Sequence, residues 1–216
     1  PGTKELFGFP SVWNYITYMA SWWNLMLGVL VVILTCNEIT YRTQRQNIID
    51  GLSRGEVILS KFYFFLLLAA FVTLYTFLLG FIFGVFNSDI SEFLSGIDYI
   101  GIYFIQTIGY FSFAFLFAVL VKRAALAIIF YVLIFIFKFV FVLALGEVAS
   151  QVMPINAFAD LTPFPFFQEI FALAASQDPN FVEPVILSQT IRSIVASGWI
   201  LIFVFLSYFI LKKRDL

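Results

Sequence analysis

The sequence has 216 residues, of which 62% are hydrophobic and 12% are charged, and its formal net charge is −1. Soluble domains contain roughly 45–50% apolar residues, so this composition excludes a soluble domain and predicts an all-α integral membrane protein. The lack of histidine excludes His-based catalytic triads and most transition-metal sites, and no metal is expected. The basic cluster at 212–214 is too short to indicate nucleic-acid binding.

The first apolar run covers 13–36 and follows Pro10 and Ser11, which are turn and cap signals. Its length exceeds the ~20 residues that cross the hydrocarbon core, so it predicts a membrane span. Aromatic side chains crowd its first half, as they do at a membrane interface.

A polar elbow at 37–61 separates this span from the next. Thr43 and Gln46 have the spacing of a capping box, and Gly51 stands where a glycine ends many helices. The elbow is therefore expected to contain a short helix over 43–50.

Ser53 and Glu56 repeat the capping-box spacing, which predicts a second helix start directly before the next apolar run. On a helical wheel the side chains of the elbow divide into two groups. Tyr41, Ile48 and Leu52 fall on one side, and Arg42, Gln46 and Asp50 fall on the other. This pattern predicts one face for the protein itself and one for a partner. The alternative is a solvated loop that its arginines keep on the cytoplasmic side.

The remaining apolar runs predict four more spans, which makes five in this chain. They cover 58–86, 100–121, 124–145 and 193–211. The turn at Lys122 and Arg123 is so short that the spans on either side of it must be antiparallel neighbours. The segment 146–192 is broken by prolines into partly apolar pieces, so we expect it to be external and to re-enter the membrane in part. All of these elements form a single domain over 1–216.

Charged residues divide between the two sides that five spans define. One side carries the bases Arg42, Arg45, Arg54, Lys61, Lys122, Arg123, Lys212, Lys213 and Arg214. The other side carries the acids Asp89, Glu92, Asp98, Glu147, Asp160, Glu169, Asp178 and Glu183, and its bases are Lys4 and Arg192. The positive-inside rule then predicts a cytoplasmic C-terminus and an external Pro1. An external start predicts a further span upstream, which gives six in the full-length protein.

Lys138 is a charge inside the predicted span 124–145, at roughly 22 Å from the inner surface. A charge at the centre of the bilayer costs about 2.5–3.5 kcal/mol on insertion scales. Lys138 either extends outward to the headgroups or faces a cavity or partner helix, where it helps to bind an anionic headgroup or substrate. Gly80 and Gly84 form a Gly-x-x-x-Gly pair, which indicates either a helix contact or relief of crowding among phenylalanines.

The order of features around the elbow resembles the permease subunits of the ABC-2 transporter family. An apolar helix ends in Asn37-Glu38, followed by Tyr41-Arg42-Thr43, a short amphipathic helix, Ser53-Arg54 and Lys61. In that family an acidic residue, a threonine, a Ser-Arg pair and a lysine build the coupling helix that docks into the ATP-hydrolysing subunit. The residue before the threonine is usually glycine there, whereas this chain has Arg42. The family also has a proline-broken external segment before its last helix and a basic C-terminal cluster followed by Asp-Leu.

The resemblance implies a permease subunit that dimerises, binds two ATPase subunits and moves a substrate across a prokaryotic inner membrane by alternating access. It implies contact with the ATPase through Glu38, Arg42, Thr43, Arg45, Gln46, Asp50 and Arg54. The chain has no Gly-x-x-x-x-Gly-Lys-Ser/Thr motif, so it is expected not to be an enzyme, and ATP and Mg are expected on the partner. The alternatives are a non-transporting scaffold or channel-like subunit, and a membrane-embedded transferase that uses the external carboxylates.

Overall fold

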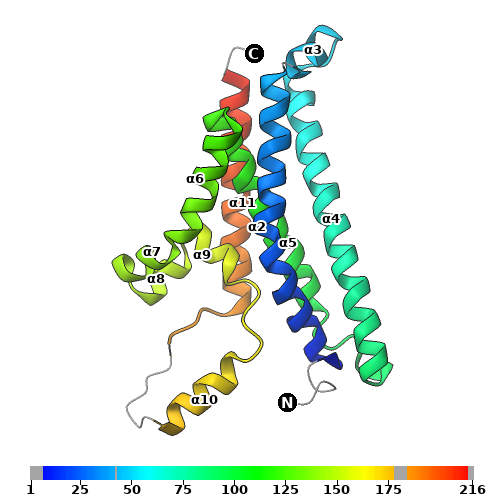
Figure 1. The fold of residues 1–216 in the computed structure, drawn as a ribbon, viewed down its shortest axis with the longest axis vertical. Coiled ribbons are helices and arrows are strands. Elements are labelled where there is room, and N and C mark those ends of the chain that lie inside the picture. The colour runs from blue at the N-terminus through cyan, green and yellow to red at the C-terminus, as the bar shows by residue number, and fades with distance from the viewer. Residues whose placement is uncertain (1–6, 42, 178–183, 214–216) are drawn as a thin grey trace.

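The computed structural model describes residues 7–41, 43–177 and 184–213, and every regular element in these ranges is helical. The helices are α2 (Ser11–Thr40), α3 (Thr43–Ile49), α4 (Arg54–Asn87), the 3-10 helix η1 (Ile90–Glu92), α5 (Asp98–Val121), α6 (Ala124–Ile136), α7 (Lys138–Leu145), α8 (Glu147–Gln151), α9 (Pro154–Ala159), α10 (Phe167–Gln177) and α11 (Gln189–Lys213). Figure 1 shows the long helices side by side as a bundle. The all-helical prediction is therefore confirmed for these residues.

Four of the described helices, namely α2, α4, α5 and α11, are long and apolar enough to cross a membrane. They contain 30, 34, 24 and 25 residues. At 1.5 Å per residue each exceeds the ~30 Å hydrocarbon core. The chain is thus a multi-pass membrane protein, and four of its five predicted spans correspond to single helices.

The predicted span over 124–145 is wrong as a single helix. The chain breaks at Phe137, between α6 and α7. The 13 residues of α6 reach only ~20 Å, which is less than the hydrocarbon core. Beyond the break α7 and α8 turn away from the bundle axis (Figure 1). No proline or glycine lies between 124 and 145 to indicate the break, and the ammonium group of Lys138 at its start is held by a partner outside this run.

Helix α5 is the centre of the bundle. It packs against α2, α4, α6, α9 and α11. The aromatic side chains of Tyr103, Phe111 and Phe115 are fully buried there. Lys122 ends α5 in the left-handed conformation at φ 60°, and its N–H donates to the carbonyl of Ala118 at 3.0 Å. This tight turn lets α6 fold back beside α5, as the short connection predicts.

Aromatic rings lie on glycines where α2 and the residues before it meet α4. A Cβ atom at Gly80 would lie 2.7 Å from the ring of Trp13, and one at Gly84 would lie 2.3 Å from the ring of Phe9. Both distances are shorter than the contacts that Cβ atoms make in real proteins. The Gly-x-x-x-Gly pair is therefore a contact site, and rings rather than a helix backbone fill the space that it leaves.

The two ends of the bundle differ in charge. Figure 1 shows α3, the start of α6 and the end of α11 at one end, and the start of α2, the end of α4 and α10 at the other. We call these the elbow end and the acidic end. Lys122, Arg123, Lys212 and Lys213 belong to the elbow end, whereas Asp89, Glu92 and Asp98 belong to the acidic end. Pro1, Lys4, Asp178, Glu183 and Arg214 lie outside the described residues.

Candidate functional site

The elbow contains the expected short helix, α3, at Thr43–Ile49. Gly51 follows it with φ 106°, a conformation that glycine adopts without the steric cost of a side chain. The N–H of Leu52 donates to the carbonyl of Asn47 at 3.0 Å, and that of Gly51 donates to Ile48 at 3.1 Å. These two bonds form a Schellman motif, which satisfies the last carbonyls of the helix.

The capping box expected at Ser53 and Glu56 is present. The Ser53 hydroxyl accepts from the Glu56 N–H at 3.3 Å, and the Ser53 N–H donates to the Glu56 carboxylate at 2.7 Å. Thr43 differs from expectation, because it is the first helical residue and its hydroxyl donates to the carbonyl of Glu38 at 3.3 Å. The capping box therefore fixes the start of α4, whereas the Thr43 hydroxyl ties the start of α3 to the end of α2.

An ion pair closes the base of the elbow. Lys61 in α4 pairs with Glu38 in α2, and both side chains are largely shielded from solvent. The pair joins the last turn of α2 to the early turns of α4. Glu38, which is predicted to contact an ATPase, is thus engaged within the chain and orients the elbow.

The two faces of α3 are both exposed. Thr43, Gln46 and Asp50 are exposed, as expected for a partner-facing side. The expectation that the opposite side faces the protein is wrong for two of its three residues. Tyr41 is 75% exposed and Leu52 is also exposed, whereas Ile48 is half-buried. A two-turn helix at the tip of the bundle has too few neighbours to cover them. Arg42 and the side chains of Arg45 and Arg54 lie outside the described residues.

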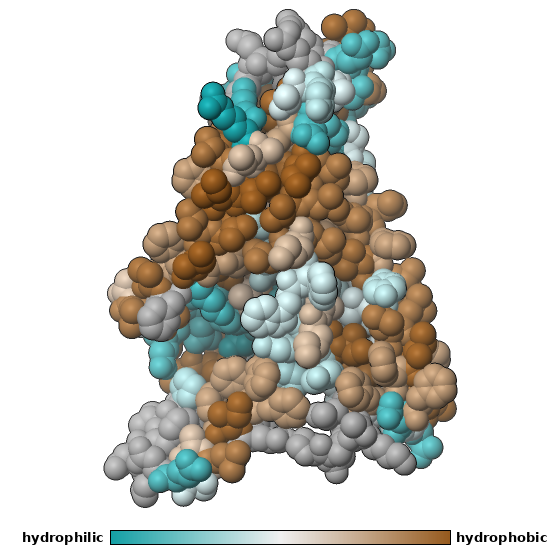
Figure 2. Space-filling model, in the orientation of Figure 1, coloured by the Kyte–Doolittle hydropathy of each residue, from teal (hydrophilic) through white to brown (hydrophobic). Residues whose placement is uncertain are grey.

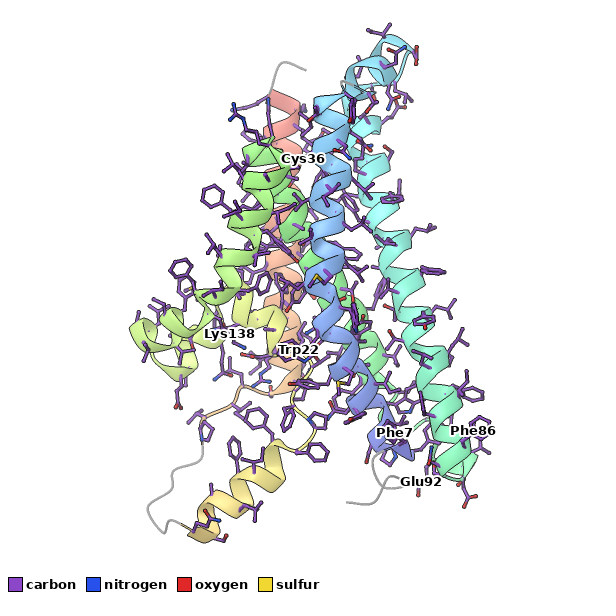
Figure 3. The ribbon with its side chains drawn as sticks, viewed as in Figure 1. Phe7, Trp22, Cys36, Phe86, Glu92 and Lys138 are labelled. Carbon is purple, nitrogen blue, oxygen red and sulfur yellow. The ribbon has the colours of Figure 1, made fainter. Side chains whose placement is uncertain are left out.

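Lys138 has a partner that its position in the sequence does not reveal. Its Nζ atom donates to Oδ1 of Asp160 at 2.5 Å, and the two side chains are 37% and 32% exposed. Figure 3 places Lys138 below α6, toward the middle of the molecule. Asp160 follows α9, 22 residues further along the chain, and the sequence places it among the external acids. Pairing with a carboxylate offsets the cost of placing the lysine at this depth.

Arg192 lies beside this ion pair. Its Nη1 atom donates to the backbone carbonyl of Asp160 at 2.9 Å, and its Nη2 atom contacts Oε1 of Gln151 at 3.4 Å. Arg192 is only 8% exposed. Gln189, one turn earlier in α11, donates to the carbonyl of Leu161 at 2.6 Å. Lys138, Gln151, Asp160, Gln189 and Arg192 form what we call the outer polar cluster.

The outer polar cluster joins α7, α8 and the residues after α9 to α11. Deeper in the bundle, Gln106 of α5 donates to the carbonyl of Phe158 at 2.8 Å and to the Thr162 hydroxyl at 3.0 Å. Hydrogen bonds therefore fix the segment between α6 and α11 to the core at several points. The signal in the sequence was Arg192, one of two bases on the side that carries the acids, but its partners follow only from the fold.

Metal and thiol chemistry find little support in the described ranges. They contain no group of three or more His, Cys, Asp or Glu residues that could hold a metal ion. Cys36 is free and buried, with its sulfur 3.9 Å from the carbonyl of Ala118. It is a small core residue at the α2–α5 contact.

No protein-family model, curated protein or solved structure matches this chain. Fold and composition define the class of the protein as a multi-pass α-helical membrane protein. The elbow and the outer polar cluster are the two candidate functional sites of this fold.

Proposed function

We propose that the chain is the permease subunit of an ABC-2 type transporter, which moves a substrate across a prokaryotic inner membrane while a separate subunit hydrolyses ATP. The observation that carries the proposal is the construction of the elbow. A short helix, α3, connects two long apolar helices and exposes polar and apolar side chains together. Tyr41 and Ile49 are 75% and 74% exposed at this polar end, and exposed apolar residues of this kind favour contact with another protein.

The elbow is suited to passing motion to the membrane helices. The ion pair between Glu38 and Lys61 ties α2 to α4, and the Ser53 capping box fixes the first turn of α4. A push on α3 by a closing ATPase dimer therefore tilts both helices together. Because α2 packs along the central helix α5, this tilt changes the packing of the core. Alternating access is then a shift between two arrangements of one bundle.

The proposed topology has five spans in this chain, if α6 and α7 count as one broken span. The elbow end carries the bases Lys122, Arg123, Lys212 and Lys213, so the positive-inside rule places it and the C-terminus in the cytoplasm. The segment from α8 to α10 is then external. It is partly re-entrant, because Ile155 and Phe158 of α9 are buried in the bundle. The proposed partners are an ATPase that binds ATP and Mg, a second copy of this chain and the lipid bilayer.

The test is co-purification with the cognate ATPase, followed by an ATPase assay in liposomes. Replacement of Tyr41 and Ile49 by aspartate is expected to weaken association at least tenfold, or about 1.4 kcal/mol. The matched control is Ile90→Asp, which alters a 64% exposed isoleucine at the acidic end and should leave association unchanged. Equal association by all three proteins would show that Tyr41 and Ile49 do not form the contact, and a parent chain that neither binds nor stimulates the ATPase would argue for a scaffold instead.

A further inference from the structure

The outer polar cluster contains two basic side chains and one acidic side chain. The carboxylate of Asp160 contacts Lys138. Arg192 instead contacts two neutral acceptors, namely the backbone carbonyl of Asp160 and the side-chain amide oxygen of Gln151. With one carboxylate for two cations, the cluster has a formal charge of +1.

This excess charge lies in an environment that does not favour it. Arg192 is 8% exposed, and its buried Nε atom has no hydrogen-bond partner among the described residues. A buried charge needs a counter-charge or hydrogen bonds to offset the loss of water. The network around Arg192 is therefore incomplete, and a single negative charge nearby would complete it.

Lys138 provides the route for such a charge. Its side chain is 37% exposed, and its ammonium group has three donors, of which Asp160 uses one. Figure 2 shows hydrophilic residues in a recess of the molecular surface, between apolar surfaces on this face. Figure 3 places Lys138 and Trp22 at a similar height on this face. An anion in the recess would reach Lys138 directly, and Arg192 contacts the same residue, Asp160, through its backbone carbonyl.

The loop that carries Asp160 adjoins an aromatic part of α2. Trp22 and Trp23 of α2 are 68% and 69% exposed. The loop that carries Asp160 lies against this part of α2, because the ring of Phe164 stands 5.3 Å from that of Tyr18, which in turn contacts Trp22. A ligand with a negatively charged group and an apolar body could contact the basic side chains with its charge and the aromatic side chains with its apolar part.

We propose that the outer polar cluster binds a phosphate group with one negative charge, which Lys138 contacts directly and Arg192 supports as a buried counter-charge. The phosphate comes either from a lipid headgroup or from a soluble phosphate ester. This inference goes beyond the permease function and does not depend on the ATPase. Failure of the ATPase association leaves it intact, and the reverse also holds.

Binding is measured on purified full-length chain in a neutral detergent, with dihexanoyl phosphatidylglycerol as the probe. Lys138→Met should weaken binding at least tenfold because it removes the direct ligand. Asp160→Asn should strengthen binding several-fold because it removes the competing carboxylate. If the Lys138–Asp160 salt bridge is only structural and binds no ligand, neither substitution should change the affinity for the probe. If Lys138→Met does not fold, Lys138→Gln and Asp160→Asn give the same comparison.

The second ion pair of the described chain supplies matched controls. Lys61→Met and Glu38→Gln remove the corresponding charges at the elbow end, where the pair is neutral, and should change binding less than twofold. Dihexanoyl phosphatidylcholine, which has no net charge, should bind more weakly than the probe. Glycerophosphoglycerol, the water-soluble diester headgroup of the probe with the same single negative charge, separates the two sources. Competition with the probe at equal concentration indicates a soluble ester, whereas no competition indicates a lipid.

The proposal is overturned if Lys138→Met and Asp160→Asn change affinity in the same direction, or if neither changes it. It is also overturned if the elbow variants lower affinity as much as Lys138→Met does. In either case the outer polar cluster is a structural contact between α7 and α11, and the probe binds to the general surface.

Discussion

The molecule has two described ion pairs that are alike in chemistry but differ in their surroundings. Lys61 and Glu38 join α2 to α4 at the elbow end, and Lys138 and Asp160 join α7 to the residues after α9. The elbow pair is balanced and borders the polar elbow. The other pair adjoins Arg192, which is buried, and its surroundings therefore carry an excess positive charge. A Lys–carboxylate ion pair can thus orient two helices at one site, while at another site it leaves a neighbouring positive charge uncompensated.

The largest expected contrast concerns which side of the membrane each region faces. Cysteines introduced as Gln46→Cys and Ser91→Cys occupy exposed positions in the elbow and in the loop after α4. In a Cys36→Ala background, a membrane-impermeant maleimide should label the first only from the cytoplasm and the second only from outside. Labelling of both from one side would refute the orientation and, with it, the transporter proposal.

Loss of Arg192 should be the most damaging change to stability among those considered. Arg192→Leu leaves the carbonyl of Asp160 without its side-chain donor, at about 1–3 kcal/mol. It also removes one of the two donors to the amide oxygen of Gln151, at about 0.5–1.5 kcal/mol, and leaves the N–H of Leu187 as the other. We expect the free energy of unfolding to fall by about 2–4 kcal/mol, seen as a lower midpoint in thermal unfolding in detergent. Arg192→Lys, which keeps the charge, should recover part of the loss. A midpoint equal to that of the parent would show that the network is not stabilising.

Removing the carboxylate from each pair tests the comparison directly. Asp160→Ala leaves Lys138 and Arg192 without a counter-charge, so it should cost about 2–3 kcal/mol. Glu38→Ala should cost less, about 1–2 kcal/mol, because it leaves one shielded ammonium group without its partner, whereas two cations depend on Asp160. Thermal unfolding of both variants at the same ionic strength measures the difference. Equal costs would mean that the two surroundings are electrostatically equivalent.

The smallest effect on stability, and the one specific to function, is expected for Glu38→Gln. This change weakens the link between α2 and α4 without removing the exposed surface of α3. Substrate moved per ATP hydrolysed should fall severalfold, while assembly with the ATPase stays within about twofold of the parent. The measurement uses reconstituted vesicles with both quantities taken from one preparation. Loss of assembly together with coupling would assign Glu38 to the interface itself.

Much of the fold could be predicted because its signals are local. Uninterrupted apolar runs identify α2, α4, α5 and α11, and Gly51 and Ser53 mark the ends of elbow helices through bonds to residues within five positions. The break at Phe137 could not be predicted, since nothing in the run 124–145 differs in hydropathy or backbone chemistry except Lys138.

The same distinction separates the two candidate sites. Elbow residues that lie close in sequence also lie close in space, so the spacing of Ser53 and Glu56 was enough to place the start of α4, whereas α3 forms without the capping box expected at Thr43. The outer polar cluster takes residues from α7, α8, the end of α9 and α11, and only the packing of these elements shows that Arg192 lies beside Asp160. The contact of α3 with an ATPase remains a prediction.

The rings that rest on glycines have a mechanical consequence. Phe9 and Trp13 fix the start of α2 to α4 at Gly84 and Gly80, while Glu38 and Lys61 fix the opposite end. Two helices held at both ends act as a single stiff lever, about 45 Å long by the rise of 30 residues in α2. A tilt of about 5° at the elbow would displace the far end of such a lever by about 4 Å. In the proposed mechanism the movement would then take place between this lever and α5, so a bulky side chain there would stall it without loosening the lever.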